Sequence, residues 1–315
     1  MNIGALINGL PGAVAQGLIW GIVAVGIYIT YKILDIADLT VDGSLCTGGA
    51  VCIMMLLAGY GNTVSLIAAL VAGMLTGVVT GFLNTAMGIP AILAGILTQL
   101  GLYSINLKIM ENRANQPINA NNYDLLVSLR NIKNVPFFEN TIFIVMAITV
   151  VIVLLLYWFF GTEFGCTLRA SGSNEAMCRA QGINVNLNRV VGLTISNGLV
   201  ALAGGLLAQY QGFADVNMGR GAIVIGLAAV VIGDAIFGRL FNNFAFNLVA
   251  VSLGSIIYYL VLQVVIWRGL DAQMLKLLSA IIVAIFLAIP YVKNQYFKSV
   301  RNPKHHAEKG VKFNA

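Results

Sequence analysis

Residues 140–160 read NTIFIVMAITVVIVLLLYWFF, a stretch without a single charged side chain. A helix needs about 20 mostly apolar residues to cross the hydrocarbon core of a bilayer, so this stretch predicts a transmembrane helix. The whole chain has the same character, because 59% of its 315 residues are hydrophobic, 10% are charged and its mean hydropathy is +0.88. Soluble domains carry roughly 25% charged residues. The composition therefore excludes a water-soluble fold.

Similar apolar segments, separated by charges or turn residues, recur along the chain. They predict an all-α polytopic membrane protein with about nine transmembrane helices. The predicted spans are residues 11–31, 44–60, 64–87, 89–107, 140–160, 190–210, 221–237, 244–267 and 274–292. Within the third span, Gly73, Gly77 and Gly81 recur at every fourth position. Small residues at this spacing predict close packing between helices.

The distribution of charge predicts the orientation of the chain. The segment 293–315 holds six Lys or Arg residues against one acid, Glu308. The positive-inside rule places such a basic tail in the cytoplasm. With an odd number of spans, the N-terminus and the loop 108–139 are then outside, and the Arg-containing loop 161–188 is inside. The formal charge of +6 does not indicate nucleic acid as a partner, since most of the surface should face membrane lipid.

The sequence shows no pattern typical of catalysis, a cofactor or a metal site. Its cysteines, at positions 46, 52, 166 and 178, form no CxxC pair and have no His-rich neighbour. The chain also lacks a Gly-Lys dipeptide, and with it the G-x-x-x-x-G-K-[ST] loop that holds nucleotide phosphates. We therefore expect no catalytic residues and no cofactor in this chain.

The loop 161–188 predicts a short helix along the inner face of the membrane. Ser173 or Asn174 can cap it, Glu175 lies in its first turn, and Gly182 can end it. Helical spacing places four apolar residues on one face: Ala176, Met177, Ala180 and Ile183. Such a helix can dock into a groove on a partner protein or rest on lipid headgroups, and the residues alone leave both alternatives open.

Several stretches resemble one family of membrane proteins. Leu168-Arg-Ala-Ser-Gly-Ser-Asn-Glu-Ala and Arg179-Ala-Gln-Gly-Ile-Asn-Val are similar to the coupling-helix region of permease subunits of bacterial ATP-binding-cassette (ABC) importers, in the branch of ribose and branched-chain amino acid permeases. Ala201-Leu-Ala-Gly-Gly205 extends the resemblance. Asp38-Leu-Thr-Val-Asp-Gly-Ser44 resembles the D-L-S-V-G-S segment of the family, with Asp42 as an extra residue. With this added acid, the segment is similar to that of a subgroup associated with uptake of tryptophan and tyrosine.

The resemblance implies a transmembrane permease domain over residues 1–292, followed by the cytoplasmic tail 293–315, in the bacterial plasma membrane. It implies a homodimer that works with two ABC ATPase subunits and an extracellular substrate-binding lipoprotein. The loop 108–139 either contacts that binding protein or is a solvated connector. The residues expected to couple the permease to the ATPase are Arg169, Ala170, Gly172, Asn174, Glu175, Ala176 and Gly182.

Polar residues within the apolar spans are candidates for the translocation path, because they are costly in a membrane. They are Asp38, Thr40, Asp42, Ser44, Asn84, Gln99 and Asn197. Each amide also has a simpler interpretation, a hydrogen bond between two helices. Asp42 and Ser44 could instead cap the second helix, after the backbone break that begins at Asp35. If Asp42 borders the path, it could contact the ammonium group of an amino acid.

Two other functions remain alternatives from the sequence. The permease could carry a branched-chain amino acid, a sugar or a nucleoside. The chain could also be a secondary transporter driven by an ion gradient. That class predicts interrupted spans in two corresponding halves, whereas the sequence shows one interrupted region.

Overall fold

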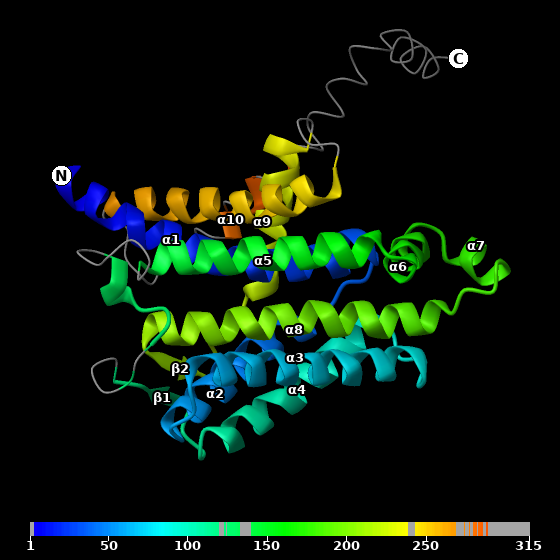
Figure 1. Cartoon of the computed structure of the whole chain (residues 1–315), viewed down its shortest axis with the longest axis horizontal. Helices are drawn as coiled ribbons and strands as arrows, with labels where there is room; N and C mark the ends of the chain where they lie inside the picture. Colours follow the sequence, from blue (N-terminus) through cyan, green and yellow to red (C-terminus); the bar gives the residue numbers. More distant parts are fainter. Residues whose placement is uncertain are drawn as a thin grey trace, which may run out of the picture.

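The computed structural model describes residues 3–119, 123, 125–132, 140–238 and 243–268, together with scattered positions between 274 and 288. Its long helices follow one another along the chain (Figure 1). They are α1 (Ile3–Tyr28), α2 (Thr40–Leu57), α3 (Asn62–Thr85), α4 (Ala91–Ile109), α5 (Thr141–Gly161), α8 (Val185–Gln211), α9 (Ala222–Phe237) and α10 (Phe244–Trp267).

Shorter elements connect these helices. A π-helix, η1 (Ile29–Ile33), continues α1, and a 3-10 helix, η2 (Leu129–Ile132), precedes α5. Two helices, α6 (Glu163–Ser173) and α7 (Glu175–Ala180), lie between α5 and α8. Strands β1 (Asn115–Pro117) and β2 (Phe213–Asp215) form an antiparallel pair in which Gln116 faces Ala214.

Seven helices of the described part are long and apolar enough to cross a membrane, and they confirm a polytopic helical fold. Eight of the nine predicted spans coincide with helices. One of the eight, α9, has only 16 residues, fewer than the roughly 20 that a full crossing needs. The predicted ninth span, 274–292, lies largely outside the described residues. The predicted count of nine full spans is therefore not confirmed.

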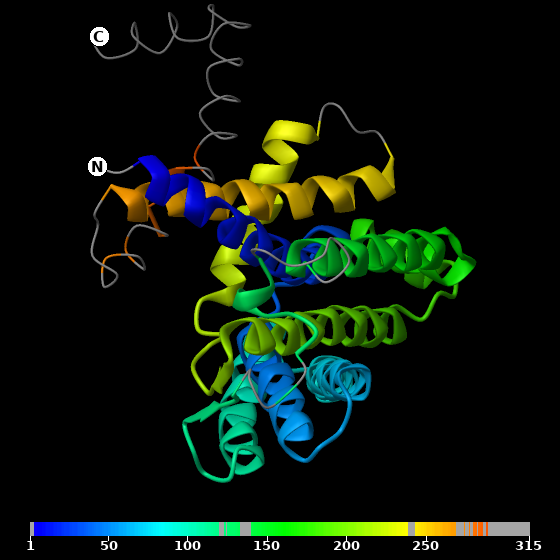
Figure 2. The same ribbon diagram turned by 60° about the vertical axis from the view of Figure 1, so that its left-hand side comes forward.

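Helix α8 lies at the centre of the bundle, against α1, α2 and α3. In two views, α9 crosses the neighbouring long helices at a steep angle (Figures 1 and 2). The predicted glycine ladder on α3 faces α8, and a Cβ on Gly73 or Gly77 would overlap the α8 backbone. Close packing at these glycines is therefore confirmed.

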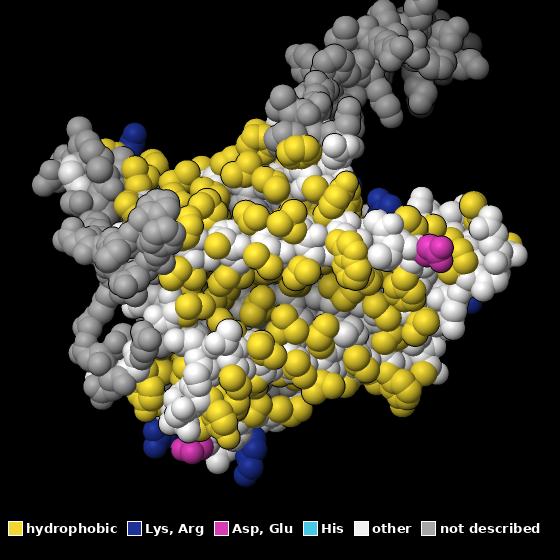
Figure 3. Space-filling model, in the orientation of Figure 1, with side chains coloured by type: hydrophobic (Ala, Val, Ile, Leu, Met, Phe, Trp, Pro, Cys, Tyr) yellow, Lys and Arg dark blue, Asp and Glu magenta, His cyan; other side chains and the backbone are white. Residues whose placement is uncertain are grey.

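The surface separates apolar and charged side chains. Figure 3 shows hydrophobic side chains over the middle of the molecule and charged ones near its two ends. Leu100 and Trp158 are 65% and 71% exposed, as expected for side chains that face lipid rather than water. The loop 161–188 lies at one end, with the Lys32–Asp234 ion pair of 2.8 Å.

Candidate functional site

The inner loop 161–188 forms two helices rather than the single short helix predicted. Thr162 caps α6, since its Oγ1 accepts a hydrogen bond from Gly165 N at 3.3 Å. Asn174 then takes an extended conformation, with φ −152° and ψ 94°, and ends α6. Its side-chain oxygen accepts a hydrogen bond from Met177 N at 3.0 Å, so Asn174 also caps α7. Of the two caps that the sequence allows, Ser173 and Asn174, the structure uses Asn174.

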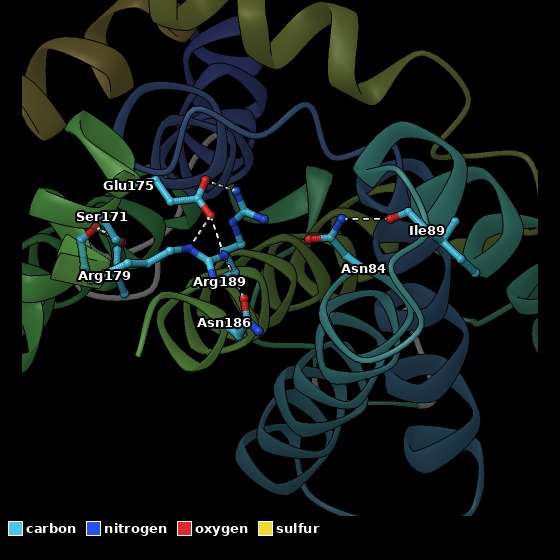
Figure 4. A network of polar contacts seen from close by, with 8 residues as sticks. Asn84, Ile89, Ser171, Glu175, Arg179, Asn186 and Arg189 are labelled. Atoms are coloured by element: carbon cyan, nitrogen blue, oxygen red, sulfur yellow. Dashed lines mark hydrogen bonds and ion pairs between the residues drawn. The ribbon is translucent and has the colours of Figure 1, made fainter. Parts of the chain in front are cut away.

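Glu175 joins α7 to the start of α8 (Figure 4). Its Oε1 accepts a hydrogen bond from Arg179 Nη2 at 2.6 Å, and its Oε2 accepts one from Arg189 Nη2 at 2.6 Å. The hydrogen bond from Arg179, with the positive charges of Arg189 and Arg179, lowers the pKa of the Glu175 carboxyl. The carboxylate is therefore charged at neutral pH, and its ion pairs with Arg179 and Arg189, called here the Glu175 clamp, join α7 to α8.

Gly172 sets the contact between α6 and the end of the first transmembrane helix. A Cβ at this position would overlap the carbonyl group of Ile33 and lie 2.9 Å from Leu34 Cα. Leu168, one turn earlier, is fully buried. Helix α6 is therefore seated directly on the backbone of η1.

The rest of the loop leaves apolar atoms uncovered. Met177 is 54% exposed, and Ala176 and Ala180 beside it are also exposed, whereas Cys178 is buried. Gly182 has a φ of +78°, which suits glycine and ends the loop helix as predicted. Together these residues present an apolar patch on a short helix with fixed ends.

Two further predicted coupling residues lie on α6. The guanidinium of Arg169 lies 5.5 Å from the centre of the Phe244 ring, a distance typical of a cation–π contact. Ala170 is half-buried. Arg169 therefore connects α6 to the start of α10.

The backbone break after η1 leads into a buried polar cluster. Asp38 is only 2% exposed. Its Oδ1 accepts a hydrogen bond from Thr40 N at 2.9 Å, and its Oδ2 accepts one from Asn197 Nδ2 at 2.7 Å. Ser44 Oγ donates to Asn197 Oδ1 at 2.6 Å and shares a hydrogen bond of 2.7 Å with Thr76 Oγ1. The structure thus joins four of the residues predicted for the translocation path.

A second row of hydroxyl groups extends the cluster across α3 to α4. Thr40 Oγ1 and Thr80 Oγ1 are 2.8 Å apart, and Thr80 Oγ1 donates to Thr98 Oγ1 at 3.0 Å. Thr76, Thr80 and Thr98 were not predicted from the sequence. The spacing of Thr76 and Thr80, on a helix with a glycine ladder, was the available signal.

Asp42 does not cap the second helix. That prediction is wrong, because the hydrogen bond at the start of α2 goes to Asp38 and Ser44 bonds within the cluster. Asp42 Oδ2 accepts a hydrogen bond from Gly221 N at 3.0 Å, and Oδ1 accepts one from Ile223 N at 3.1 Å. Asp42 therefore caps the N-terminus of α9, which lies far away in sequence.

The two remaining candidates lie outside the polar cluster. Asn84 Nδ2 donates to Ile89 O at 2.9 Å in the turn between α3 and α4 (Figure 4). Gln99 lines a pocket beside Asp42. Asp35, where the break begins, is exposed and has a φ of +54°.

Comparison with known proteins finds matches over most of the chain. Residues 10–290 match the family described as branched-chain amino acid transport system / permease component. A tyrosine transport system permease protein of Clostridioides difficile is 37% identical, and the match covers 89% of this chain and 91% of the relative. An uncharacterized protein of Rickettsia prowazekii is 36% identical over 91% of this chain and 99% of the relative.

The fold also resembles a solved structure of a metal-chelate type ABC transporter in an inward-facing conformation. The TM-score is 0.51 at 13% identity, and the match covers 90% of this chain and 85% of that chain. The likeness concerns the fold alone. The family match and the seven helices that are long and apolar enough to cross a membrane identify the chain as a multi-pass plasma-membrane protein. The chain belongs to the branched-chain amino acid transport system permease family, and it is a transport subunit of the ABC importer type rather than an enzyme.

Proposed function

We propose that this permease forms the translocation pathway of an ABC importer for aromatic amino acids such as tyrosine or tryptophan. The observation that carries the substrate class is the 37% identity to a tyrosine transport system permease over 89% of the chain. The working complex is a homodimer of this chain with two ATPase subunits and an extracellular substrate-binding lipoprotein. The N-terminus is outside and the basic tail 293–315 is cytoplasmic.

Helix α7 is the docking element for the ATPase. Its exposed apolar patch around Met177 provides the contact, and the Glu175 clamp fixes its orientation against α8. Closure of the two ATPase subunits around ATP then moves α6 and α7 as a unit. The residues that carry this coupling are Arg169, Ala170, Gly172, Asn174, Glu175, Ala176 and Gly182.

The movement reaches the interior through Gly172. This residue touches the backbone of Ile33, and Asp38 lies five residues further along the same segment. Asp38, Thr40, Ser44 and Asn197 are then the residues that rearrange when access changes sides. Among the other candidates, Gln99 and Asp42 lie at the pathway through their shared pocket. Asn84 has a structural role in the turn at Ile89.

Uptake by a reconstituted complex tests this function. The permease, its ATPase subunits and its binding protein are placed in proteoliposomes containing ATP, and entry of radiolabelled L-tyrosine and L-tryptophan is measured. We expect saturable uptake that unlabelled leucine or ribose inhibits at least tenfold more weakly than tyrosine. An ATPase subunit without its nucleotide-binding lysine serves as the control and should abolish uptake. Uptake that an ion gradient drives without the ATPase would contradict the proposal.

A further inference from the structure

A pocket of about 290 Å³ lies between α2, α4 and the connection from β2 to α9. Its polar lining comes from three separate parts of the chain: Asp42 on α2, Gln99 and Asn106 on α4, and Arg220 before α9. The pair β1–β2, which precedes this connection, lies beside α2 and α4 (Figure 1). The volume is near the lower end of the range for small-molecule sites.

Asn106 gives the pocket an unused hydrogen-bond acceptor. The residue is 1% exposed, and its side-chain oxygen Oδ1 has no hydrogen-bond partner among the residues that the structure describes. A buried polar atom without a hydrogen-bond partner destabilises the folded protein. Such an atom in the wall of a pocket calls for a donor from a bound molecule, such as an ammonium group.

Asp42 and Arg220 give the pocket one negative and one positive charge. The Asp42 carboxylate uses its oxygens for Gly221 N and Ile223 N, but a carboxylate has about four acceptor positions, so it can accept further hydrogen bonds. Arg220 is exposed and forms no ion pair within the described part of the chain. Its guanidinium is available for a carboxylate, which it can bind through two parallel hydrogen bonds.

The geometry points to a binding site for a zwitterionic α-amino acid in this pocket. This inference rests on the proposed function and adds a substrate site within the permease itself. The ammonium group of the amino acid binds Asn106 Oδ1 and the Asp42 carboxylate. Arg220 binds the carboxylate of the amino acid. Tyr103, also in the lining, contacts an aromatic side chain. A zwitterion offers a charge of opposite sign to each of Asp42 and Arg220, whereas a neutral sugar offers none.

Binding to the full-length permease in lipid nanodiscs tests the site without the external binding protein. The probe is radiolabelled L-tryptophan, competed with tryptamine, which lacks the carboxylate, and with indole-3-propionate, which lacks the ammonium group. We expect each analogue to compete at least tenfold more weakly than tryptophan. Asn106→Leu and Arg220→Gln should each weaken tryptophan binding at least tenfold. In Arg220→Gln, the preference for tryptophan over tryptamine should fall to within threefold.

Two matched variants control for folding and charge. Gln209→Leu removes another buried amide with an unpartnered oxygen, away from the pocket lining. Arg113→Gln removes an exposed positive charge on the segment before β1. Both should bind tryptophan within twofold of the unchanged permease. Thermal unfolding of every variant in the nanodisc shows whether a loss of binding reflects a loss of fold.

The two proposals can fail separately. If the full complex imports tryptophan but the nanodisc permease does not bind it, or if Asn106→Leu and Arg220→Gln bind it like the controls, the site is wrong and the function stands. If the complex imports leucine but no aromatic amino acid, the proposed substrate is wrong. Binding of labelled leucine to the same four variants then tests the zwitterion site. The site is wrong if Asn106→Leu and Arg220→Gln bind leucine as well as the two controls do.

Discussion

Gly172 is a residue whose small size is required by a backbone rather than by a side chain. Both atoms nearest to its missing Cβ belong to the main chain of Ile33, and Leu34 Cα follows at 2.9 Å. A flexible side chain could move aside, but these atoms belong to a helix end that α8 also holds, since Leu34 packs against Gly192. Even one added methyl group must therefore push α6 away from η1.

Gly172→Ala should uncouple the two reactions of the complex. We expect the permease to reach the membrane at a level within twofold of the unchanged protein, because the strain lies in a loop outside the spans. Uptake per ATP hydrolysed should fall at least tenfold, since the displacement of α6 no longer reaches the break at Asp38. Parallel assays of uptake and phosphate release in proteoliposomes measure this ratio.

Gly161→Ala is the control for this substitution. Gly161 lies at the start of the same loop, and a Cβ there meets no atom within 4 Å. Its ratio of uptake to hydrolysis should stay unchanged. A Gly172→Ala complex with the same ratio would show that the contact between α6 and η1 does not transmit motion.

Among the elements, α9 depends on a residue that another helix supplies. The N–H groups at the start of α9 have no partner within the helix, and the Asp42 carboxylate of α2 accepts hydrogen bonds from two of them. A side-chain cap contributes about 0.5–2 kcal/mol in water-exposed helices, and an unpaired polar group costs more in an apolar environment. The start of α9 is thus tied to the start of α2.

Asp42→Ala should therefore lower the stability of the permease as well as its uptake. We expect a loss of about 2 kcal/mol in the free energy of unfolding, seen as a lower midpoint of thermal unfolding in detergent. Asp35→Asn, at an exposed position of the same break, should leave the midpoint unchanged. An Asp42→Ala permease that unfolds at the normal temperature would refute the capping role.

The same helix shows how far the sequence predicts this fold. The bounds of α9 agree with the predicted span 221–237, because apolar composition and length depend only on neighbouring residues. Its cap could not be predicted, since Asp42 lies about 180 residues earlier and meets Gly221 only in the folded chain. Local sequence therefore makes Asp42 a candidate cap of its own helix, where a first-turn acid is common, beside its other interpretation as a residue of the path.

In the inner loop and the polar cluster, too, the sequence predicts some features and misses others. Asn174 and Gly182 were predicted as helix ends because capping is local. The split into α6 and α7 was missed, since an extended Asn174 can end one helix and begin the next. Thr76 and Thr80 were missed because threonines in apolar helices commonly bond to their own backbone, as Thr80 also does with Thr76 O.

At the scale of the whole molecule, the helices alternate between two ends. The loop 161–188, Lys32 and the start of α10 gather at one end, while β1, β2 and the end of α4 lie at the other. The proposed topology places the first of these ends in the cytoplasm. Cys166 on α6 is exposed, and the other three cysteines, 46, 52 and 178, are buried. A thiol reagent can therefore report on which side of the membrane α6 lies, without an introduced cysteine.

A membrane-impermeant maleimide should therefore label Cys166 from one side only. We expect at least tenfold more labelling in inside-out vesicles than in right-side-out vesicles, where the bilayer shields the cytoplasmic end. Cys166→Ala should remove the signal. Arg113→Cys in that background, on the segment before β1, should show the reverse preference. Labelling of Cys166 only in right-side-out vesicles would invert the topology.

The hydrogen-bonded row from Asp38 through Asn197 and Ser44 to Thr76 also limits how this protein can diverge. Each side chain in the row satisfies the next, and all four are buried. Replacing one by an apolar residue leaves a buried neighbour without its hydrogen-bond partner. Replacing several of them at once with side chains that bond or pack with each other leaves no such unpaired group. Among descendants of this sequence, these four positions should therefore change as a group, with covariation strongest between positions 38 and 197.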